Sequence, residues 1–284
     1  MQRYQKILLA VDLYENYDDL VKEAQRLQTA YQATLKVVYV TPHIVSSLPY
    51  AYNFQDSIRT QAEKRLQALQ AKFGFSEDAL FLREGNPKEE ITDLARELQA
   101  DLIISGSHGK HGFELILGST ANGILHLASC DVLTLRINDE GKHLGDFSYK
   151  NIVLAADLQE DNLPVIRRAQ ALQEQYQAKL HIIHVVGDVA SLGYYPPIEI
   201  DLKGEAEKNL AELIQNQHLN VNADQVHVKI GFPREEILGL AQHVHADLII
   251  IGSHGHKAIA SALLGSTTNA VLHGANCDVL VVRI

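Results

Sequence analysis

The sequence repeats itself at about half its length, and this repeat constrains the fold more than any other feature. The run ADLII at 100–104 returns at 246–250, inside a longer match of residues 85–137 with residues 231–284. Shorter matches join 24–33 to 169–178 and 62–66 to 206–210. A period of this length is the size of a whole domain and far exceeds a solenoid repeat. We therefore predict two homologous domains, residues 1–137 and 150–284, joined by a polar, glycine-containing linker at 138–149.

Short apolar runs alternate with stretches of helical periodicity inside each copy. This alternation is typical of βαβ units, and runs that are apolar throughout suit strands buried on both faces. We expect an α/β fold of two tandem doubly wound, Rossmann-like domains, each with a five-stranded parallel sheet and four helices. The expected strands are residues 7–11, 35–40, 80–82, 102–104 and 132–135 in the first copy, and 152–156, 180–186, 226–230, 248–251 and 279–282 in the second.

The composition fits a soluble globular protein and argues against several classes of partner. Hydrophobic residues make up 46% of the 284 residues, and the formal net charge is −10 at pH 7. This acidic balance, with no block of lysines and arginines, predicts neither nucleic acid nor membrane as a partner. The apolar run before Asp12 is too short for a signal peptide or a membrane span, and two cysteines supply no disulfide framework. We expect a cytoplasmic protein.

An aspartate follows the first expected strand of each copy. In open parallel sheets, ligands bind beyond the carboxyl ends of the strands, at the crevice where the strand order reverses. Asp12 and Asp157 stand at this place. One interpretation is that each caps the turn that follows, and the other is that each accepts hydrogen bonds from a ligand's sugar or base. Position alone favours neither.

The strongest local signal follows the fourth strand. Residues 106–109 and 252–255 both read GSHG, and GST follows at 118–120 and 265–267, opening an apolar helix. Glycines let a backbone approach a ligand closely, and a Gly-Ser-Thr helix start presents amides and hydroxyls to an anion. The pattern is that of a phosphate cradle. Two glycine turns and an ordinary helix cap would give the same letters.

With these motifs the chain resembles the universal stress protein family. The resemblance occurs twice and covers nearly the whole length of the chain. The motifs are the first strand ending in Asp, the Gly-Ser-His-Gly turn, the Gly-Ser helix start and the closing Cys-Asp-Val-Leu strand. In nucleotide-binding members of that family, two glycines separated by two residues are followed, after nine residues, by Gly and then Ser or Thr. The second copy fits, with residues 256–264 between Gly255 and Gly265, whereas the first has only eight residues, 110–117. The second copy is therefore the favoured site.

The resemblance implies an adenine nucleotide ligand, ATP or else AMP or ADP, with Mg²⁺ as a candidate companion. In the second copy it implies that Asp157 contacts the adenosine, that the backbone near Val185 contacts the adenine, and that the glycine motif holds ribose and phosphates. The motif residues are Gly252, His254, Gly255, Gly265, Ser266 and Thr267. Their counterparts in the first copy are Asp12, Val40, Gly106, His108, Gly109, Gly118, Ser119 and Thr120. The resemblance also implies that the two domains pair through their final strands, and a homodimer of whole chains is a further expectation.

Other chemistries have weaker signals. His108 and His111 have a ligand-like spacing, but no carboxylate or cysteine lies close by in sequence and the second copy has no second histidine there, so no metal site is predicted. His181 and His184 point to opposite faces of a strand. The GSHG turn lacks the glycine of a nucleophile elbow, so no catalytic residue is predicted. Cys130 and Cys277 are expected to be buried thiols.

The leading hypothesis is a nucleotide-responsive stress or signalling protein without dedicated catalysis, although slow ATP hydrolysis stays open. The alternatives are a nucleotide-free interaction scaffold and an enzyme that cleaves ATP to AMP and pyrophosphate. Tyrosine-containing loops at residues 49–52 and 194–197 follow the second strand of each copy, either as lids or as plain surface loops.

Overall fold

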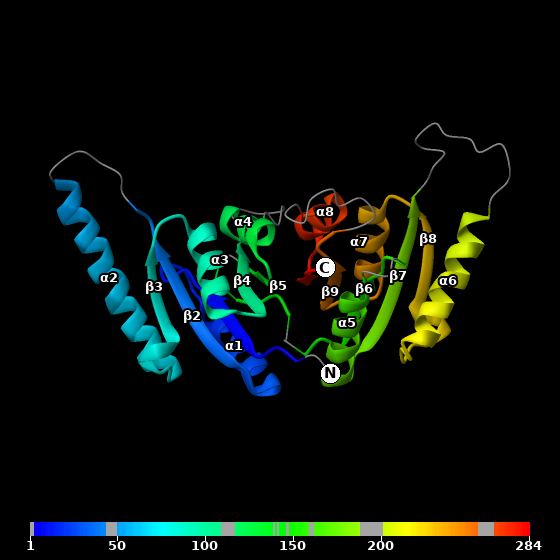
Figure 1. The fold of residues 1–284 in the computed structure, drawn as a ribbon, viewed down its shortest axis with the longest axis horizontal. Helices are drawn as coiled ribbons and strands as arrows, with labels where there is room; N and C mark the ends of the chain where they lie inside the picture. The colour runs from blue at the N-terminus through cyan, green and yellow to red at the C-terminus, as the bar shows by residue number, and fades with distance from the viewer. Residues whose placement is uncertain are drawn as a thin grey trace. The chain divides into compact units, whose positions relative to one another are not determined.

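The computed structural model describes residues 3–43, 50–108, 117–138, 140, 142–145, 148–158, 162–187, 201–254 and 264–284. The chain divides into two compact units, Arg3–Leu144 and Gly145–Ile284, which we call the N-terminal and C-terminal units. Helices and strands alternate along both (Figure 1). None of the helices described is long and apolar enough to cross a membrane.

The N-terminal unit contains five parallel strands and four α-helices among its described residues, as the apolar runs predict. In chain order these are β1 (Lys6–Ala10), α1 (Asp18–Tyr31), β2 (Thr34–Thr41), α2 (Tyr50–Phe73), β3 (Leu80–Glu84), α3 (Pro87–Leu98), β4 (Leu102–His108), α4 (Ser119–Leu127) and β5 (Asp131–Ile137). The strands lie in the order β3-β2-β1-β4-β5. The direction of winding therefore reverses between β1 and β4.

The C-terminal unit repeats this plan. Its elements are β6 (Asn151–Ala155), α5 (Leu163–Tyr176), β7 (Lys179–Gly187), α6 (Leu202–Asn216), β8 (Val226–Gly231), α7 (Pro233–His243), β9 (Leu248–Gly252), α8 (Ser266–Gly274) and β10 (Asp278–Val282). The order β10-β9-β6-β7-β8, parallel throughout, places the reversal between β6 and β9. The prediction of two doubly wound α/β domains is confirmed.

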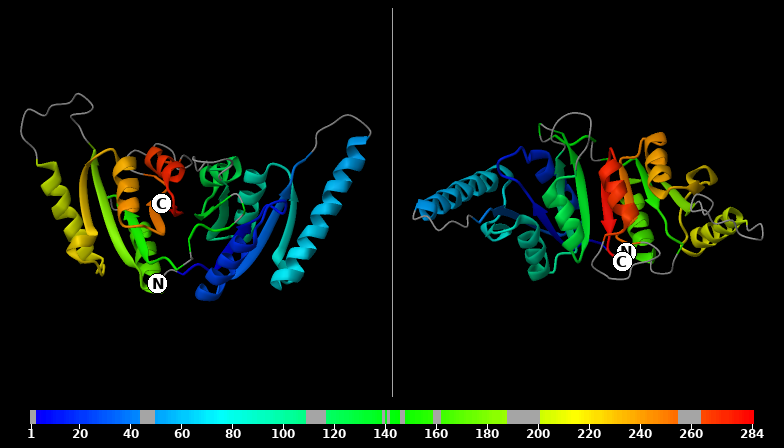
Figure 2. Two further views of the ribbon diagram at one scale, coloured as in Figure 1. Left: turned by 180° about the vertical axis from the view of Figure 1, so that it is seen from behind. Right: turned by 90° about the horizontal axis from the view of Figure 1, so that it is seen from above.

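The core of each unit lies between its sheet and the helices that cover both faces. Right-handed crossovers place α1 and α2 on one face of the first sheet and α3 and α4 on the other, as the two views in Figure 2 show. Strands such as β5 and β10 are buried along their whole length because they are covered from both sides. Helix α1 buries its apolar stripe, which includes Leu20, Val21, Ala24 and Leu27, against the sheet.

Two pairs of polar contacts recur at the amino ends of the sheets. The carboxylate of Asp101 accepts hydrogen bonds from the amides of Gln5 and Lys6, and Asp247 does the same for Lys150 and Asn151. These aspartates belong to the repeated ADLII runs. This part of the repeat therefore corresponds to a structural contact at the start of the first strand in each unit.

The buried hydroxyls of Tyr4 and Tyr149 donate to Asp131 and Asp278, each across 2.7 Å. Each bond joins the start of a unit to the start of its final strand. Cys130 and Cys277, one residue before these aspartates, are half-buried rather than fully buried as expected.

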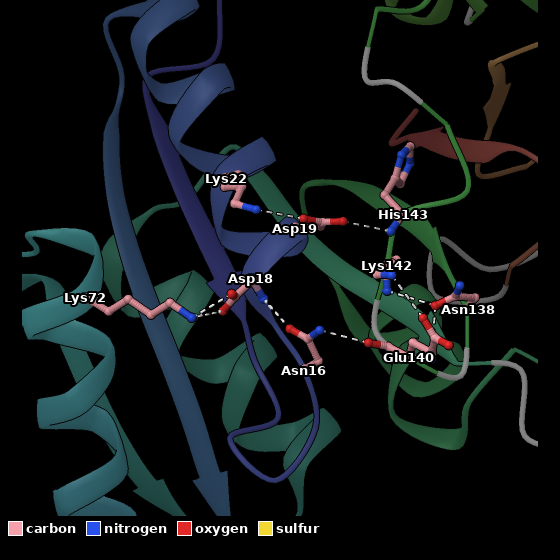
Figure 3. A network of polar contacts seen from close by, with 9 residues as sticks. All are labelled: Asn16, Asp18, Asp19, Lys22, Lys72, Asn138, Glu140, Lys142 and His143. Atoms are coloured by element: carbon pink, nitrogen blue, oxygen red, sulfur yellow. Dashed lines mark hydrogen bonds and ion pairs between the residues drawn. The ribbon is translucent and has the colours of Figure 1, made fainter.

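Part of the segment expected to be a linker folds back on the N-terminal unit. This return segment, described at residues 138, 140 and 142–144, pairs with the end of β5 through an antiparallel bridge between Ile137 and His143. Its other contacts reach the start of α1, as Figure 3 shows: Asn16 Nδ2 donates to the carbonyl of Glu140, and the amide of His143 donates to Asp19. These residues therefore serve as a structural part of the first unit.

The tyrosine loop expected at residues 49–52 is in part helical, which corrects that prediction. Helix α2 begins at Tyr50, so residues 50–52 form its first turn, while residue 49 and the matching loop at 194–197 lie outside the described residues.

Candidate functional site

The predicted site residues gather at the carboxyl ends of the strands flanking each reversal point. In the C-terminal unit these are the chain after β6, which carries Asp157, and the chain after β9, which leads towards α8. In the N-terminal unit they are the matching ends of β1 and β4. This is the position at which open parallel sheets bind ligands. Gly109 and Gly255 lie outside the described residues, as does the side chain of His108.

In the C-terminal unit the turn after β9 is bonded directly to the start of α8. The amide of Ser253 donates to the carbonyl of Val282 across 2.8 Å, and the carbonyl of Ser253 accepts from the amide of Gly265, also across 2.8 Å. The hydroxyl of Thr268 donates to the carbonyl of Gly252 across 2.7 Å. The two halves of the predicted cradle therefore meet, although twelve positions separate Ser253 from Gly265 in the sequence.

The start of α8 has the properties of an anion-binding helix end. Gly265 is its N-cap, Ser266 is exposed and Thr267 is half-buried. The first amides of a helix have no partner within it and carry the positive end of the helix dipole. The φ and ψ angles of Gly265, −62° and 148°, are open to any residue. The backbone therefore does not require a glycine here.

His254 presents a buried polar atom without a partner beside the turn. Its Nδ1 atom lies 2.9 Å from the Ser253 hydroxyl, and Ser253 is fully buried. Its Nε2 atom is buried and has no hydrogen-bond partner among the residues that the structure describes. A buried polar atom without a partner costs free energy, so this nitrogen marks a place where a polar ligand group would be stabilising.

The other side of the crevice is formed by the ends of β6 and β7. The carbonyl of Asp157 accepts a 2.6 Å hydrogen bond from the side-chain Nδ2 atom of Asn162, a buried residue at the start of α5. His184 Nδ1 lies 2.9 Å from the carbonyl of Ala156, which fixes that ring beside the β6 end. Val185 follows in β7 and is half-buried. Asp157 and the backbone near Val185 therefore lie at the carboxyl ends of neighbouring parallel strands.

Packing leaves little room for a side chain at Gly252. A Cβ atom there would lie 2.5 Å from Ile284 Cδ1, 3.3 Å from the carbonyl oxygen of His254 and 3.4 Å from Val165 Cγ2. The backbone thus approaches α5 and the chain end closely. At Gly118, the N-cap of α4, a Cβ atom would meet nothing within 4 Å.

The N-terminal unit has a different arrangement at the matching place. Here β4 continues through Gly106 to His108, paired with β5 as far as Ile137. Ser107 is buried, and its hydroxyl donates to the carbonyl of Leu135 and accepts from the buried Arg136. Ser119 and Thr120 at the start of α4 are exposed. Ala121 replaces Thr268, so the hydroxyl link to β4 has no chemical counterpart.

Asp12 caps the turn that follows β1. Its Oδ1 atom accepts a 2.9 Å hydrogen bond from the amide of Tyr14, two residues on, which is an Asx turn. The capping interpretation of this residue is thus confirmed. Val40 in β2, unlike Val185, is buried.

Aromatic and cationic side chains crowd the same edge of the N-terminal unit. The guanidinium carbon of Arg65 lies 4.1 Å from the centroid of the Tyr14 ring, and its Nη1 atom donates to the carbonyl of Leu13. The Tyr14 and Tyr39 rings are 6.5 Å apart. Burial, together with the negative charge of Asp12, raises the pKa of Tyr39 to about 12. The C-terminal unit has His184 and Asn209 where this cluster has Tyr39 and Arg65.

Sequence reasoning identified the glycine turns and the helix starts but missed the side chains that join them. Thr268 is one of two threonines in a row, and Asn162 and His184 stand outside any motif. One signal was available: the two copies differ at all three positions, with Ala121, Tyr17 and Tyr39 in the first. Comparing the copies position by position would have drawn attention to them.

Comparisons with known proteins agree with the internal repeat. The model of the universal stress protein family matches residues 3–136 and again residues 148–283. Universal stress protein A homolog 2 of Coxiella burnetii is 38% identical over 144 residues, which are 48% of this chain and 98% of that protein. A universal stress protein of Mycolicibacterium smegmatis is 25% identical over 98% of this chain and 96% of its own.

The same architecture is found in a solved structure. A universal stress protein from Archaeoglobus fulgidus superposes with a TM-score of 0.69 at 20% identity, covering 98% of this chain and 96% of that one. At this level of identity the likeness shows the two-unit fold.

Proposed function

Since this chain belongs to the universal stress protein family, matched over both units, we propose that it is a regulatory protein that binds an adenine nucleotide in the crevice of its C-terminal unit. The observation that carries the proposal is the bonding of Ser253 and Gly252 to Gly265 and Thr268. This bonding holds a helix start, whose first amides have no partner within the helix, against the end of β9. Such an end suits a phosphate.

The proposed contacts follow the geometry of the crevice. The amides at the start of α8, with the hydroxyls of Ser266 and Thr267, would hold the phosphates. The buried Nε2 atom of His254 would gain a polar partner. Asp157 would accept from the ribose, and the half-buried backbone near Val185 would meet the adenine. Gly252 and Gly255 complete the proposed set.

A metal ion would enter with the nucleotide. In the part of the chain that the structure describes, no three His, Cys, Asp or Glu side chains are grouped so that they could hold a metal ion. Mg²⁺ keeps several waters and is commonly bound by substrate phosphates with one or two carboxylates. We expect Mg²⁺ to raise ATP affinity through the phosphates.

Two structural differences favour the C-terminal unit over the N-terminal one. Thr268 links α8 to β9, whereas Ala121 has no hydroxyl to donate. Val40 is buried where Val185 is half-buried. The shorter glycine loop of the first copy points the same way.

The test is calorimetric titration of the full chain with ATP and with AMP. We expect saturable binding by the wild type and its loss in Gly265→Val, whose added methyl groups would occupy the cradle without backbone strain, since φ is −62°. Gly118→Val is the matched control, with a φ of −59° at the other helix start. It should leave the principal binding event intact. Absence of saturable binding by the wild type would overturn the proposal.

A further inference from the structure

Two histidines of the C-terminal unit face each other on neighbouring strands, away from the crevice. The Nδ1 atom of His181 in β7 lies 3.5 Å from the Nε2 atom of His227 in β8. The ring centroids are 5.7 Å apart and the ring planes differ by 22°. Because the two nitrogens are closer together than the ring centres, they occupy the facing edges of the rings. His227 pairs with Ile183, two residues after His181, so both histidines lie on one face of the sheet.

The separation of the nitrogens matches that of two ligands of one metal ion. Imidazole nitrogens bind Zn²⁺ at 2.0–2.1 Å, so two of them at a tetrahedral angle lie about 3.4 Å apart. We propose that His181 and His227 form a two-histidine site for a divalent transition metal ion that prefers imidazole, Zn²⁺ or Cu²⁺, with water in the remaining positions.

The protonation of the two rings suits this role. Burial lowers the pKa of His181, and burial together with the nearby His181 lowers the pKa of His227. Burial therefore favours the neutral form of each ring, which offers one lone pair. Without metal, a proton on one of the facing nitrogens can point at the other. A bound metal ion takes the place of that proton, and each ring then carries its hydrogen on its outer nitrogen.

The surrounding charges decide which ions the site can hold. Asp224 favours a cation there, whereas Lys179, Lys229 and His243 disfavour one. With one carboxylate against two lysines, the surroundings supply no net attraction for a hard, oxygen-preferring ion such as Ca²⁺ or Mg²⁺. Affinity must come from the imidazole bonds themselves, which are strongest with Cu²⁺ in the first-row series.

The N-terminal unit shows that the fold does not need histidines at these positions. Lys36 and Phe81 stand where the C-terminal unit has His181 and His227, and Glu97 stands where it has His243. Lys36 forms an ion pair with Asp78 across 2.8 Å, and Glu97 pairs with Arg83. Ordinary ion pairs thus occupy this part of the first sheet. The histidines of the second sheet are a departure from the shared plan.

The proposed metal site is separate from the nucleotide crevice. His181 and Val185 are four residues apart in β7, which is about 13 Å along a strand. His181 lies near the amino end of the strand and the crevice at its carboxyl end. Loss of either site should therefore leave the other intact, and the two proposals can fail independently.

The test is calorimetric titration of the full chain with ZnCl₂, comparing the wild type with the double variant His181→Gln/His227→Gln. We expect the wild type to bind one more equivalent of Zn²⁺ than the double variant. Each single variant should weaken that event about 10-fold or more. His273→Gln, at an exposed position at the end of α8, is the matched control and should retain it.

A second readout reports the ligands directly. With one equivalent of Cu²⁺, electron paramagnetic resonance should show two nitrogen ligands in the wild type and in His273→Gln, and lose that signature in the double variant. Circular dichroism should confirm that the double variant is folded. Equal Zn²⁺ stoichiometry and an unchanged Cu²⁺ spectrum in the folded double variant would overturn the proposal.

Discussion

The hydroxyl of Thr268 donates to the carbonyl oxygen of Gly252 across 2.7 Å, which joins the first turn of α8 to the last residue of β9. Thr268 is almost wholly buried. The N-terminal unit has Ala121 at this position. One hydroxyl group therefore distinguishes the two helix starts at the place where the sequences otherwise agree most closely.

Replacing Thr268 with valine should destabilise the C-terminal unit by about 1 kcal/mol, because valine keeps the shape but removes the donor. The same change should weaken nucleotide binding, since the start of α8 loses one of its links to the end of β9 and keeps the Ser253–Gly265 bond. Urea denaturation and ATP titration measure the two effects. Thr268→Ser keeps the hydroxyl and is the control; if serine and valine behaved alike, the bond would have no such role.

Two glycines of the repeated motifs should respond differently to alanine. Gly252→Ala places a methyl group 2.5 Å from Ile284 Cδ1 and close to Val165, so we expect a loss of about 1 kcal/mol, with the side chain of Ile284 moving aside. Gly118→Ala meets nothing within 4 Å, and its stability should stay within about 0.5 kcal/mol of the wild type. Urea midpoints of the two variants decide the matter.

Tyr39 should be among the last tyrosines to ionise. Burial and the charge of Asp12 raise its pKa from 10.0 to about 12. The neutral ring is favoured in the folded protein, so this group stabilises the fold below pH 10 and that contribution is lost as the pH rises towards 12. Ultraviolet titration of the wild type against Tyr39→Phe should show one late-titrating phenol. In Asp12→Asn that phenol should ionise earlier, and an unchanged curve would refute the proximity of the two groups.

The ionised carboxylate of Asp19 should stabilise the folded protein at neutral pH and lose this effect in acid. Burial alone would raise the pKa of Asp19, but hydrogen bonds from Lys22 and from the amide of His143 outweigh burial and lower it below 3.8. The stabilisation is therefore present above pH 3.8 and is lost as the pH falls through the folded pKa. Asp19→Asn should cost about 0.5 kcal/mol at neutral pH. The difference in free energy of unfolding between the wild type and Asp19→Asn should become smaller as the pH is lowered. Urea denaturation at several pH values measures it.

The N-terminal unit should gain stability from losing a hydroxyl. Thr134 Oγ1 and Ser105 Oγ are buried and have no hydrogen-bond partner in the part of the chain that the structure describes. The two residues are paired across β4 and β5. The C-terminal unit has Val281 and Ile251 instead. Thr134→Val should therefore stabilise the protein by about 1 kcal/mol. A lower urea midpoint for this variant would show that the hydroxyl has a partner in solution, such as an ordered water.

Much of the fold could be predicted from the sequence because the strands are buried on both faces and read as uninterrupted apolar runs. All ten strands lie at the expected places. The extension of β4 to His108 was not foreseeable, because Ser107 and His108 are polar and join the sheet through their backbone pairing with Arg136 and Ile137. The polar sequence of residues 138–149 likewise predicted a linker. In the structure Asn16 and Asp19 bind part of it, the return segment, to the N-terminal unit.

The candidate site was predictable in its position and not in its contacts. Glycine motifs and strand ends located the crevice, because those depend on backbone geometry and topology. Which way a hydroxyl or a carboxylate points depends on neighbours distant in sequence, as Thr268 and Gly252 show. The sequence relates His181 only to the nearby His184 on the same strand. The structure places it beside His227, which is 46 residues away in the sequence.

The buried bond between Tyr4 and Asp131 has a consequence for biosynthesis. It joins residues that are 127 positions apart, so the first unit cannot close until the start of β5 has left the ribosome. The C-terminal unit, Gly145–Ile284, is made after that, which takes about 7 to 28 s at common elongation rates. The N-terminal unit can thus be complete before the C-terminal one has emerged, and so escapes mispairing with strands of similar sequence.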